Sequence, residues 1–294
     1  MMRVLVTGAT GQIGREVVAQ LSATGCRIRA LTRRTESAAV PRGVDVVRGD
    51  LTEAGTLDAA LDHVDAVFLL WVAPFSAAAA AIERIVSRTD RIVFLSSPHR
   101  TPHPFFQQPN ALRAVHAGLE ELIDRSGVGW TFLRPGAFAL NCRNWWAPQI
   151  QAGDVVRWFH GAAATAPIHE HDIAAVAVRA LCEDGHDRKE YVLTGPESVT
   201  QRDQVQIIGT AIGRALRFEE LSPEAARQQL SAWPAAVVEM LLSAYAAAVG
   251  IPALVTSTVA DVTGAPARRF RDWATDHAAD FAAPAAPAAR RESV

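Results

Sequence analysis

The stretch Val4-Leu5-Val6-Thr7-Gly8-Ala9-Thr10-Gly11-Gln12-Ile13-Gly14 decides the fold. A short apolar run ends in three glycines spaced three residues apart, and a helical pattern begins directly after the last of them. This order predicts a strand, a tight turn and a helix. Gly8 permits a sharp turn, Gly11 lets a diphosphate approach the backbone, and Gly14 lets the helix pack closely on the strand. The free N–H groups of the helix then face phosphates, which predicts a dinucleotide site; the alternative is a purely structural glycine-rich turn.

Length and composition are those of a globular α/β protein. The 294 residues are 49% hydrophobic and 20% charged, which suits one large domain or a domain with a smaller appendage. The formal net charge of −2 excludes the basic surface of a nucleic-acid-binding protein or of one that docks on an anionic membrane. No uncharged apolar run reaches the roughly 20 residues of a membrane span.

The cysteines and the start of the chain indicate a cytoplasmic protein. Cys26, Cys142 and Cys182 are an odd set without CxxC spacing, as expected for thiols buried in a reducing compartment. The chain enters its first strand within a few residues of Met1, so we expect no signal peptide. A monomer and a homodimer both fit the sequence.

The end of the second strand indicates which dinucleotide binds. Residues 27–32 alternate in period two and predict this strand. An NAD-specific site usually ends it with an Asp or Glu that binds the ribose 2′-hydroxyl, whereas here Arg33 and Arg34 follow. A guanidinium pairs with a 2′-phosphate and a carboxylate repels it, so we expect NADP(H), with Arg33 the better placed. The alternative is two solvated loop arginines.

Strands and helices alternate through the first half of the chain. Apolar or alternating runs predict strands at 44–51, 66–72, 91–97 and 129–136, separated by helices at 53–61, 76–86 and 111–125. This alternation predicts a parallel, doubly wound sheet of the Rossmann type. Thr52 is the expected N-cap of the helix at 53–61. Asp50 either accepts a hydrogen bond from the adenine amino group or is a turn residue.

The alternation weakens beyond about residue 141. We expect short strands at 155–159, 166–168 and 191–194 and helices at 173–182, 202–213, 223–230, 235–249 and 266–277, with Asp172 and Ser222 as N-caps. The predicted organisation is an NADP(H)-binding Rossmann domain over 1–150, to which 160–195 contribute elements, and a smaller, mostly helical substrate domain over 151–281. The alanine- and proline-rich tail over 282–294 is predicted to be disordered.

Four motifs in this order resemble the NmrA-like group of atypical short-chain dehydrogenases/reductases: residues 8–14, 133–138 (Leu-Arg-Pro-Gly-Ala-Phe), 194–197 (Thr-Gly-Pro-Glu) and 262–266 (Val-Thr-Gly-Ala-Pro). The resemblance covers residues 4–281. It implies a Rossmann domain with a small C-terminal domain, NADP(H) binding and a substrate cleft between the two. Some members reduce quinones, azo compounds or unsaturated carbonyls, and others only sense the dinucleotide and regulate a partner.

The usual catalytic motif of that superfamily, Tyr-x-x-x-Lys, is missing. Leu112 and His116 occupy its two places, and the only lysine of the chain is Lys189, far downstream. Hydride transfer chiefly needs proximity and orientation, so a conjugated acceptor can still be reduced. His116, Ser97 or His99 are candidates to polarise a carbonyl, and His116 also to bond the nicotinamide ribose. The alternative for His116 is a partly buried helix histidine.

Aromatic residues gather near the ends of the predicted strands and predict an apolar pocket for a flat substrate: Trp71, Phe75, Phe105, Phe106, Phe138, Trp145, Trp146 and Trp158. Core packing is the alternative for any one of them. Trp145 and Trp146 are adjacent and cannot bury both rings on one helix face, so at least one is expected to meet the cleft or a partner.

All four side chains of the stretch His169-Glu170-His171-Asp172 are of types that bind metals, and residues two apart would share a face in a strand. No further His or Cys set follows at ligand spacing. We therefore expect a loop that caps the next helix and no metal.

These patterns give the following candidate residues. Catalytic candidates are His116 and Ser97, and substrate contacts are expected from Pro74, Phe75, His99, Trp145 and Trp146. Cofactor contacts are expected from Thr7, Gly8, Thr10, Gly11, Gln12, Ile13, Gly14, Arg33, Arg34, Asp50, Leu51, Leu70, Trp71, Val72, Ser96, Pro135, Gly136 and Phe138. The favoured function is an NADPH-dependent reductase of a small aromatic or conjugated carbonyl or quinone; the alternative is a non-catalytic NADP(H) sensor that binds a protein partner.

Overall fold

A seven-stranded parallel sheet forms the centre of the protein in the computed structural model, which describes residues 1–35 and 40–282. The strand order is β3-β2-β1-β4-β5-β6-β9, and every neighbouring pair is parallel. The bounds are β1 Arg3–Val6, β2 Arg27–Thr32, β3 Asp45–Arg48, β4 Ala66–Leu69, β5 Arg91–Leu95, β6 Gly129–Pro135 and β9 Lys189–Leu193. All but one residue of the tail predicted to be disordered lie outside the described residues.

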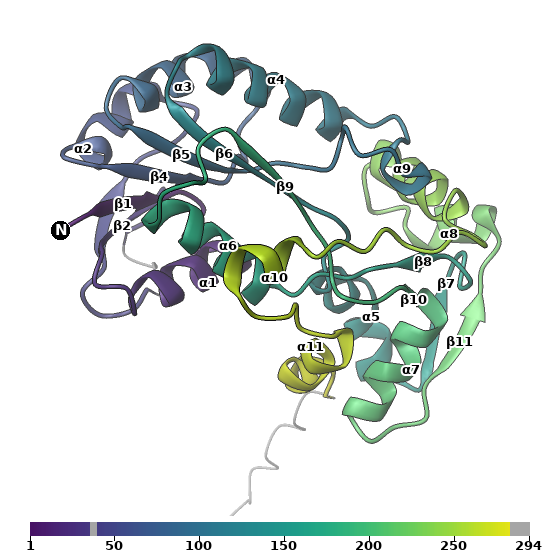
Figure 1. The fold of residues 1–294 in the computed structure, drawn as a ribbon. Helices are drawn as coiled ribbons and strands as arrows, with labels where there is room; N and C mark the ends of the chain where they lie inside the picture. The colour runs from purple at the N-terminus through teal and green to yellow at the C-terminus, as the bar shows by residue number, and fades with distance from the viewer. Residues whose placement is uncertain (36–39, 283–294) are drawn as a thin grey trace, which may run out of the picture.

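Helices cover both faces of this sheet (Figure 1). On one face lie α1 (Gln12–Leu21) and α6 (Glu170–Cys182), and on the other lie α2 (Asp58–Leu61), α3 (Ala78–Val86) and α4 (Ala111–Arg125). The period of two along β1 explains the two layers, because Val4 and Val6 pack with the α1 core and Leu5 packs with the opposite core. The predicted doubly wound Rossmann-type architecture is confirmed.

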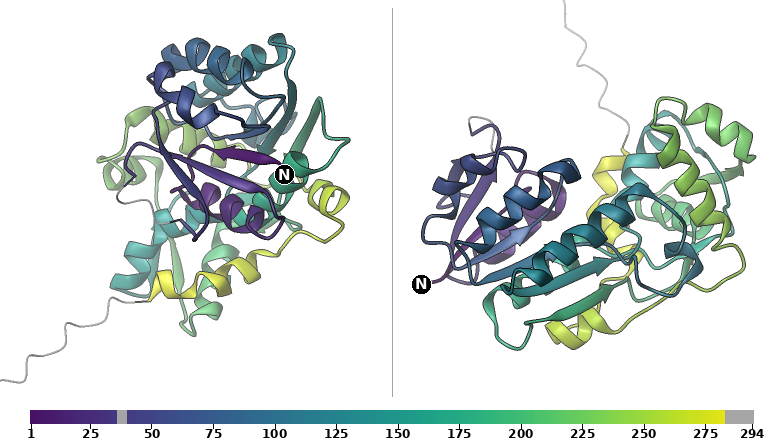
Figure 2. Two further views of the ribbon diagram at one scale, coloured as in Figure 1. Left: turned by 90° about the vertical axis from the view of Figure 1, so that its left-hand side faces the viewer. Right: turned by 90° about the horizontal axis from the view of Figure 1, so that it is seen from above.

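Most of the remaining elements gather at one end of the sheet (Figure 2, right). Two small sheets lie there, a parallel pair of β7 (Val155–Trp158) with β11 (Arg217–Glu220) and an antiparallel pair of β8 (Ala164–Thr165) with β10 (Val199–Thr200). The helices of this part are α5 Leu140–Ala152, α7 Gln201–Ala211, α8 Pro223–Gln229, α9 Ala235–Ala246 and α11 Phe270–Asp276. The short helix α10 (Thr258–Thr263) instead packs beside α6 and β9. Four 3₁₀ turns complete the described chain: η1 Ala54–Leu57, η2 Phe75–Ala77, η3 Pro104–Phe106 and η4 Ala278–Phe281.

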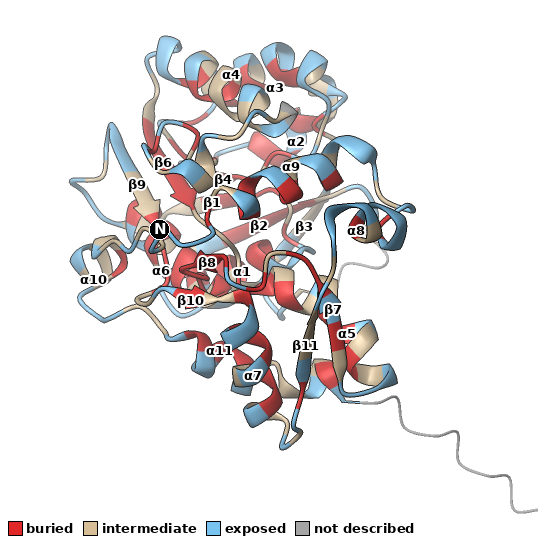
Figure 3. Cartoon of the chain, turned by 90° about the vertical axis from the view of Figure 1, so that its right-hand side faces the viewer, coloured by how far each residue is buried: buried red, intermediate tan, exposed pale blue. Residues whose placement is uncertain are grey.

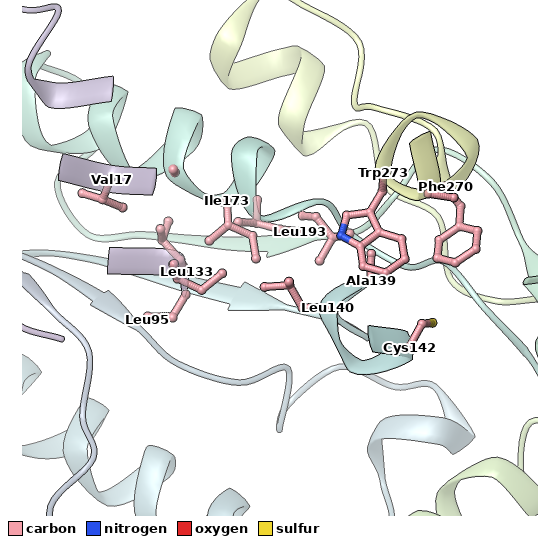
Figure 4. Packing of buried hydrophobic residues seen from close by; sticks show 14 of the residues in the cluster. Val17, Leu95, Leu133, Ala139, Leu140, Cys142, Ile173, Leu193, Phe270 and Trp273 are labelled. Carbon is pink, nitrogen blue, oxygen red and sulfur yellow. The ribbon is translucent and has the colours of Figure 1, made fainter. Parts of the chain in front are cut away.

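One continuous apolar core joins this end to the sheet. Figure 4 shows Leu140 and Cys142 of α5 beside Phe270 and Trp273 of α11, in line with the sheet residue Leu133. The buried residues lie on the strands and on the inward sides of the helices, and the outward sides are exposed (Figure 3). No helix among the described residues is long and apolar enough to cross a membrane.

Several predicted element boundaries are wrong. The segment 53–61 is η1 followed by the short α2, and Thr52 does not cap it, because the Thr52 hydroxyl donates to the Asp50 carboxylate at 2.8 Å. The strand expected at 166–168 lies instead at β8, and the helix expected from residue 266 begins at Phe270. The helix α10 was not predicted.

The N-cap of α6 also differs from the expectation. His169 takes this position and accepts the backbone N–H of His171 on its Nδ1 at 3.1 Å. Asp172 lies inside the helix and accepts the backbone N–H of Arg268 at 2.7 Å. The stretch therefore caps the helix, as expected, through a different residue.

Candidate functional site

The glycine loop between β1 and α1 has the geometry that its sequence predicts. Gly8 lies in the left-handed region at φ +63°, and its carbonyl accepts the N–H of Gly11 at 2.9 Å. A Cβ on Gly14 would lie 2.1 Å from the Gly8 carbonyl oxygen, so only glycine lets α1 approach so closely. The Thr7 hydroxyl exchanges hydrogen bonds with the backbone of Leu70 at 2.7 and 3.0 Å, which locks the loop to the end of β4.

A groove of about 660 Å³ runs from this loop across the carboxyl ends of β1, β2 and β3. One side of the groove, formed by Thr7, Gly8 and Val72, lies between β1 and β4, where the strand order reverses and doubly wound sheets bind their ligands. The groove brings together eight of the eighteen predicted cofactor residues: Thr7, Gly8, Thr10, Arg33, Arg34, Asp50, Leu51 and Val72, with Pro74 beside them.

The far end of the groove is cationic. Arg33 and Arg34 are exposed there, and neither has an ion-pair partner among the described residues. Thr32 shapes the turn, because its hydroxyl accepts the Arg34 N–H at 3.2 Å. Asp50 is the only acidic side chain among the described lining residues; hydrogen bonds from Thr52 hold the pKa of its carboxyl below its usual value. A glycine cradle at one end and two unpaired guanidinium groups at the other fit a phosphate-bearing dinucleotide.

A second cavity of about 430 Å³ begins where the groove ends, at the carboxyl ends of β4, β5 and β6. Most of its wall is apolar, which suits a small organic ligand. It brings together thirteen predicted residues: Ile13, Leu70, Trp71, Ser96, Ser97, His99, Phe105, Phe106, His116, Pro135, Gly136, Phe138 and Trp145.

Four polar atoms around this cavity are buried without a hydrogen-bond partner in the described structure: Trp71 Nε1, Ser97 Oγ, His99 Nε2 and His116 Nδ1. An unsatisfied buried polar atom costs about 1–3 kcal/mol, so four around one cavity indicate groups that bind a ligand. Burial, and secondarily His99, lowers the pKa of His116 below its usual value, so its imidazole is neutral at pH 7.

A buried charge network stands behind this wall. Glu120 accepts the Ser96 hydroxyl at 2.5 Å and two nitrogens of Arg134 at 2.9 and 2.6 Å. Arg134 also donates to Glu190 at 2.5 Å. These bonds tie the ends of β5 and β6 to α4. They also occupy the Ser96 hydroxyl, which was expected to contact the cofactor.

His99 lies between the network and the cavity. Its Nδ1 is 3.0 Å from the Ser97 carbonyl oxygen, and its Nε2 is 3.4 Å from Glu120 Oε2, an ion-pair contact without hydrogen-bond geometry. Both nitrogens therefore face acceptors, which favours the charged ring, yet burial is the larger effect and lowers the pKa of His99.

Three predicted substrate residues do not reach the cavity. Trp146 is fully buried in the core beside Trp158, and only its neighbour Trp145 lines the cavity. Pro74 lines the dinucleotide groove instead. Phe75 packs toward Gly118 on the outer side of α4, because it begins the turn η2 that leads away from the cleft.

Sequence reasoning missed another set of cavity residues. The loop before α4 and its first turn supply Gln108, Asn110, Leu112 and Arg113, α5 supplies Asn141, and α9 supplies Met240, Leu241, Ala244 and Tyr245. Leu112 stands at the tyrosine place of the missing Tyr-x-x-x-Lys motif, and no motif marks the other residues of this set. The sequence of α9 is apolar along nearly its whole length, so it does not show which of its side chains face the cavity.

A second cluster of titratable groups lies between α6 and the C-terminal turn η4. His277 is 2.5 Å from Glu170 through Nε2 and 2.8 Å from Asp280 through Nδ1. These carboxylates, Glu170 first, raise the pKa of His277. The described residues contain no group of His, Cys, Asp and Glu side chains arranged to hold a metal.

Comparison with known proteins agrees with this geometry. Residues 8–184 match the model of a family described as NAD(P)H-binding. The chain is 40% identical to a (4-alkanoyl-5-oxo-2,5-dihydrofuran-3-yl)methyl phosphate reductase of Streptomyces griseus, over 95% of this chain and 99% of the relative. It is 32% identical to an NAD(P)H azoreductase of Xenophilus azovorans, again over 95% and 99%.

The fold is also found among solved structures. Triphenylmethane reductase of Citrobacter sp. superposes with a TM-score of 0.80 at 20% sequence identity, over 94% of this chain and 99% of that one. The chain belongs to the NAD(P)H-binding family, among the NmrA-like, atypical short-chain oxidoreductases.

Proposed function

We propose that the protein is an NADPH-dependent reductase that transfers hydride to a small conjugated carbonyl or quinone-type substrate without a Tyr-x-x-x-Lys relay. The observation that carries this proposal is the apolar cavity with unpartnered polar atoms in its wall, directly beside the dinucleotide groove. The two named relatives act on an azo compound and on a ring whose double bond is conjugated with carbonyl groups. Both support a conjugated acceptor.

The residues would divide the work as follows. The glycine loop would hold the diphosphate and Arg33 the 2′-phosphate, and a bound NADPH would supply the hydride. Trp145 and Phe138 would hold a flat substrate between apolar surfaces. Closing such a cavity over the substrate excludes water from the reaction.

His116 and Ser97 are the proposed polar contacts of the reaction. A neutral imidazole and a hydroxyl can each donate a hydrogen bond to a substrate oxygen or to the nicotinamide ribose, and His116 Nδ1 and Ser97 Oγ have no hydrogen-bond partner among the described residues. In the overall reaction the substrate gains a hydride and one proton, and NADPH becomes NADP⁺. A conjugated acceptor spreads the developing negative charge, so a weak donor or water suffices for the proton.

We further propose that residues 1–150 with 160–195 bind the cofactor and that 151–281 form the substrate part. The strand β9 joins the central sheet and α6 packs beside α1, which supports the contribution of 160–195. The helix α9 supplies one wall of the cavity, which supports the role of the later residues.

The test is NADPH oxidation with a panel of acceptors: a quinone, an unsaturated lactone, an azo dye and a saturated ketone as control. We expect turnover with at least one conjugated acceptor and none with the ketone, and faster turnover with NADPH than with NADH at equal concentrations. No turnover with any acceptor, together with different affinities for NADP⁺ and NADPH, would instead support a dinucleotide sensor.

A further inference from the structure

We propose that Arg143, on α5, binds the diphosphate of the dinucleotide and supplies the positive charge that the glycine loop itself lacks. The proposal rests on the cofactor shown for the family and not on the substrate or on catalysis. It assigns a role to a residue that lies outside the glycine-loop motif and more than a hundred positions after it.

The first turn of α1 has free hydrogen-bond donors and no anion. The N-cap residue, Gly11, has no side chain that could accept a hydrogen bond from the backbone N–H groups of this turn, and the turn contains no acidic residue. The backbone N–H groups of Gln12, Ile13 and Gly14 have no acceptor among the described residues, because the first intrahelical bond is that of Arg15 to Gly11. The positive end of the helix is therefore uncompensated.

Arg143 places a second positive charge at the same position. With the Gln12 amide oriented to satisfy its neighbours, its oxygen accepts from the two terminal nitrogens of Arg143 at 2.6 and 3.3 Å. Gln12 is the first residue of α1, so this contact places the guanidinium at the end of a side chain from the first turn of that helix. A guanidinium beside the positive end of a helix is destabilising unless an anion lies between the two positive charges. The diphosphate of the dinucleotide is such an anion, because its oxygens can accept from both.

The rest of the structure holds Arg143 in place without neutralising it fully. Its one described ion-pair partner is Asp280 of η4, at the long distance of 3.3 Å, and its side chain is about a quarter (26%) exposed. The same Asp280 oxygen is bonded more closely by His277 at 2.8 Å. The guanidinium is thus oriented by Gln12 on one side and by Asp280 on the other, and it retains donors for phosphate oxygens.

The test compares two arginines that would read different phosphates of the same cofactor. Arg143→Met keeps the aliphatic stem and removes the charge, and Arg33→Ala is its matched control. Binding of NADPH, NADH, ADP and 2′-AMP to the purified full chain is measured by calorimetry, because ADP contains the diphosphate without the 2′-phosphate and 2′-AMP contains the reverse.

We expect Arg143→Met to weaken NADPH, NADH and ADP alike by about tenfold, the worth of one charge-assisted contact, and to leave 2′-AMP unchanged. Arg33→Ala should weaken NADPH and 2′-AMP and spare NADH and ADP. Unchanged binding of all four ligands by Arg143→Met, or an equal loss for 2′-AMP, overturns the proposal.

Asp280→Asn separates binding from structural support. This variant breaks the ion pair that joins α5 to η4 and leaves the guanidinium intact. We expect it to bind NADPH and ADP at least as tightly as the wild type, because Arg143 loses its competing anion. If Asp280→Asn instead reproduces the loss seen with Arg143→Met, Arg143 acts only by holding η4 and the proposal is wrong. These binding results do not depend on whether any acceptor is reduced.

Discussion

Arg33 is the residue for which the sequence makes the most specific functional prediction. Its position after β2 and its lack of an ion-pair partner among the described residues favour a 2′-phosphate contact. We expect Arg33→Ala to raise the KM for NADPH by about tenfold or more and to change the KM for NADH by less than twofold, because one charge-assisted pair is lost. Steady-state kinetics with both cofactors checks this, and equal changes would show that Arg33 does not read the 2′-phosphate.

His116 carries the prediction about the polar wall of the cavity. We expect His116→Phe, which keeps a ring against Phe94, to lower kcat/KM by about tenfold or more through the loss of one hydrogen bond. The midpoint of thermal unfolding should stay the same or rise, because an unsatisfied nitrogen is removed. A variant with wild-type kinetics would make His116 a purely structural residue.

Protonation of His116 is also expected to lower kcat/KM at acidic pH. Burial lowers the pKa of His116, so the active neutral ring persists from alkaline pH down to below the ordinary histidine value of 6.5. We expect kcat/KM to fall only at lower pH, where a charge enters the apolar cavity, and we expect the fall attributable to this group to disappear in His116→Phe. His99 faces the same cavity, so the profile of His99→Gln serves as the comparison.

Residues whose contacts are local in sequence could be predicted, and residues whose contacts are distant could not. The glycine loop is local, so its φ angle and close contacts follow from spacing alone. The pair Trp145-Trp146 was expected to place at least one ring at the cleft or a partner, but which ring lines the cavity depends on the direction of α5. The position of Arg143 beside the glycine loop could not be predicted, because its partners Gln12 and Asp280 are distant in sequence.

Elements were predicted best where the pattern is local and complete. The helix α4 has the bounds expected for it, and Ser222 caps α8 by accepting the N–H of Ala225. The expected caps Thr52 and Asp172 fail, because each side chain has a better partner: Thr52 binds the carboxylate of Asp50, and Asp172 binds a distant N–H. A cap competes with tertiary contacts that the sequence does not show.

The contact between β1 and α1 predicts a cost for one added methyl group. A Cβ at position 14 would overlap the Gly8 carbonyl, and backbone on both sides leaves no room to relax. We expect Gly14→Ala to destabilise the fold by about 1–3 kcal/mol and to weaken NADPH binding. The control is Gly55→Ala, whose Cβ would meet nothing within 4 Å. Urea unfolding of both variants checks the difference, and equal stability would contradict it.

The junction of α6 and η4 predicts how stability depends on pH. Glu170, together with Asp280, raises the pKa of His277 above 6.5, so the charged ring stabilises the junction fully below pH 6.5. This contribution is lost as pH rises through the higher folded-state pKa. The stability difference between wild type and His277→Gln should therefore be largest at mildly acidic pH and shrink at alkaline pH.

Urea unfolding of the two proteins across pH measures this difference directly. His63→Gln is the control, because the side chain of His63 is 82% exposed and its contact with Asp62 is a surface one. A difference that stays constant or grows from pH 6 to pH 9 would show that His277 contributes as a neutral side chain.

The walls of the cavity come from elements that are distant in sequence, so the sequence alone does not predict all of them. The alternation of strands and helices predicts the sheet, and the sheet places the ends of β4, β5 and β6 side by side. The remaining wall comes from the loop before α4 and from α9, which meet only in the folded chain. The sequence could thus predict the cofactor half of the site more completely than the substrate half.

The proposed reaction depends on the direct passage of hydride from NADPH to a conjugated acceptor in this cavity. It is tested by one single-turnover experiment with the purified protein, an unsaturated lactone or a quinone that turns over, and NADPH that carries deuterium at the transferable position. We expect the lactone product to gain one deuterium at carbon, or for a quinone the deuterium to slow NADPH oxidation severalfold. A lactone product that contains no deuterium, or a quinone reduced at the same rate with both isotopes, would show that hydride does not pass directly from NADPH.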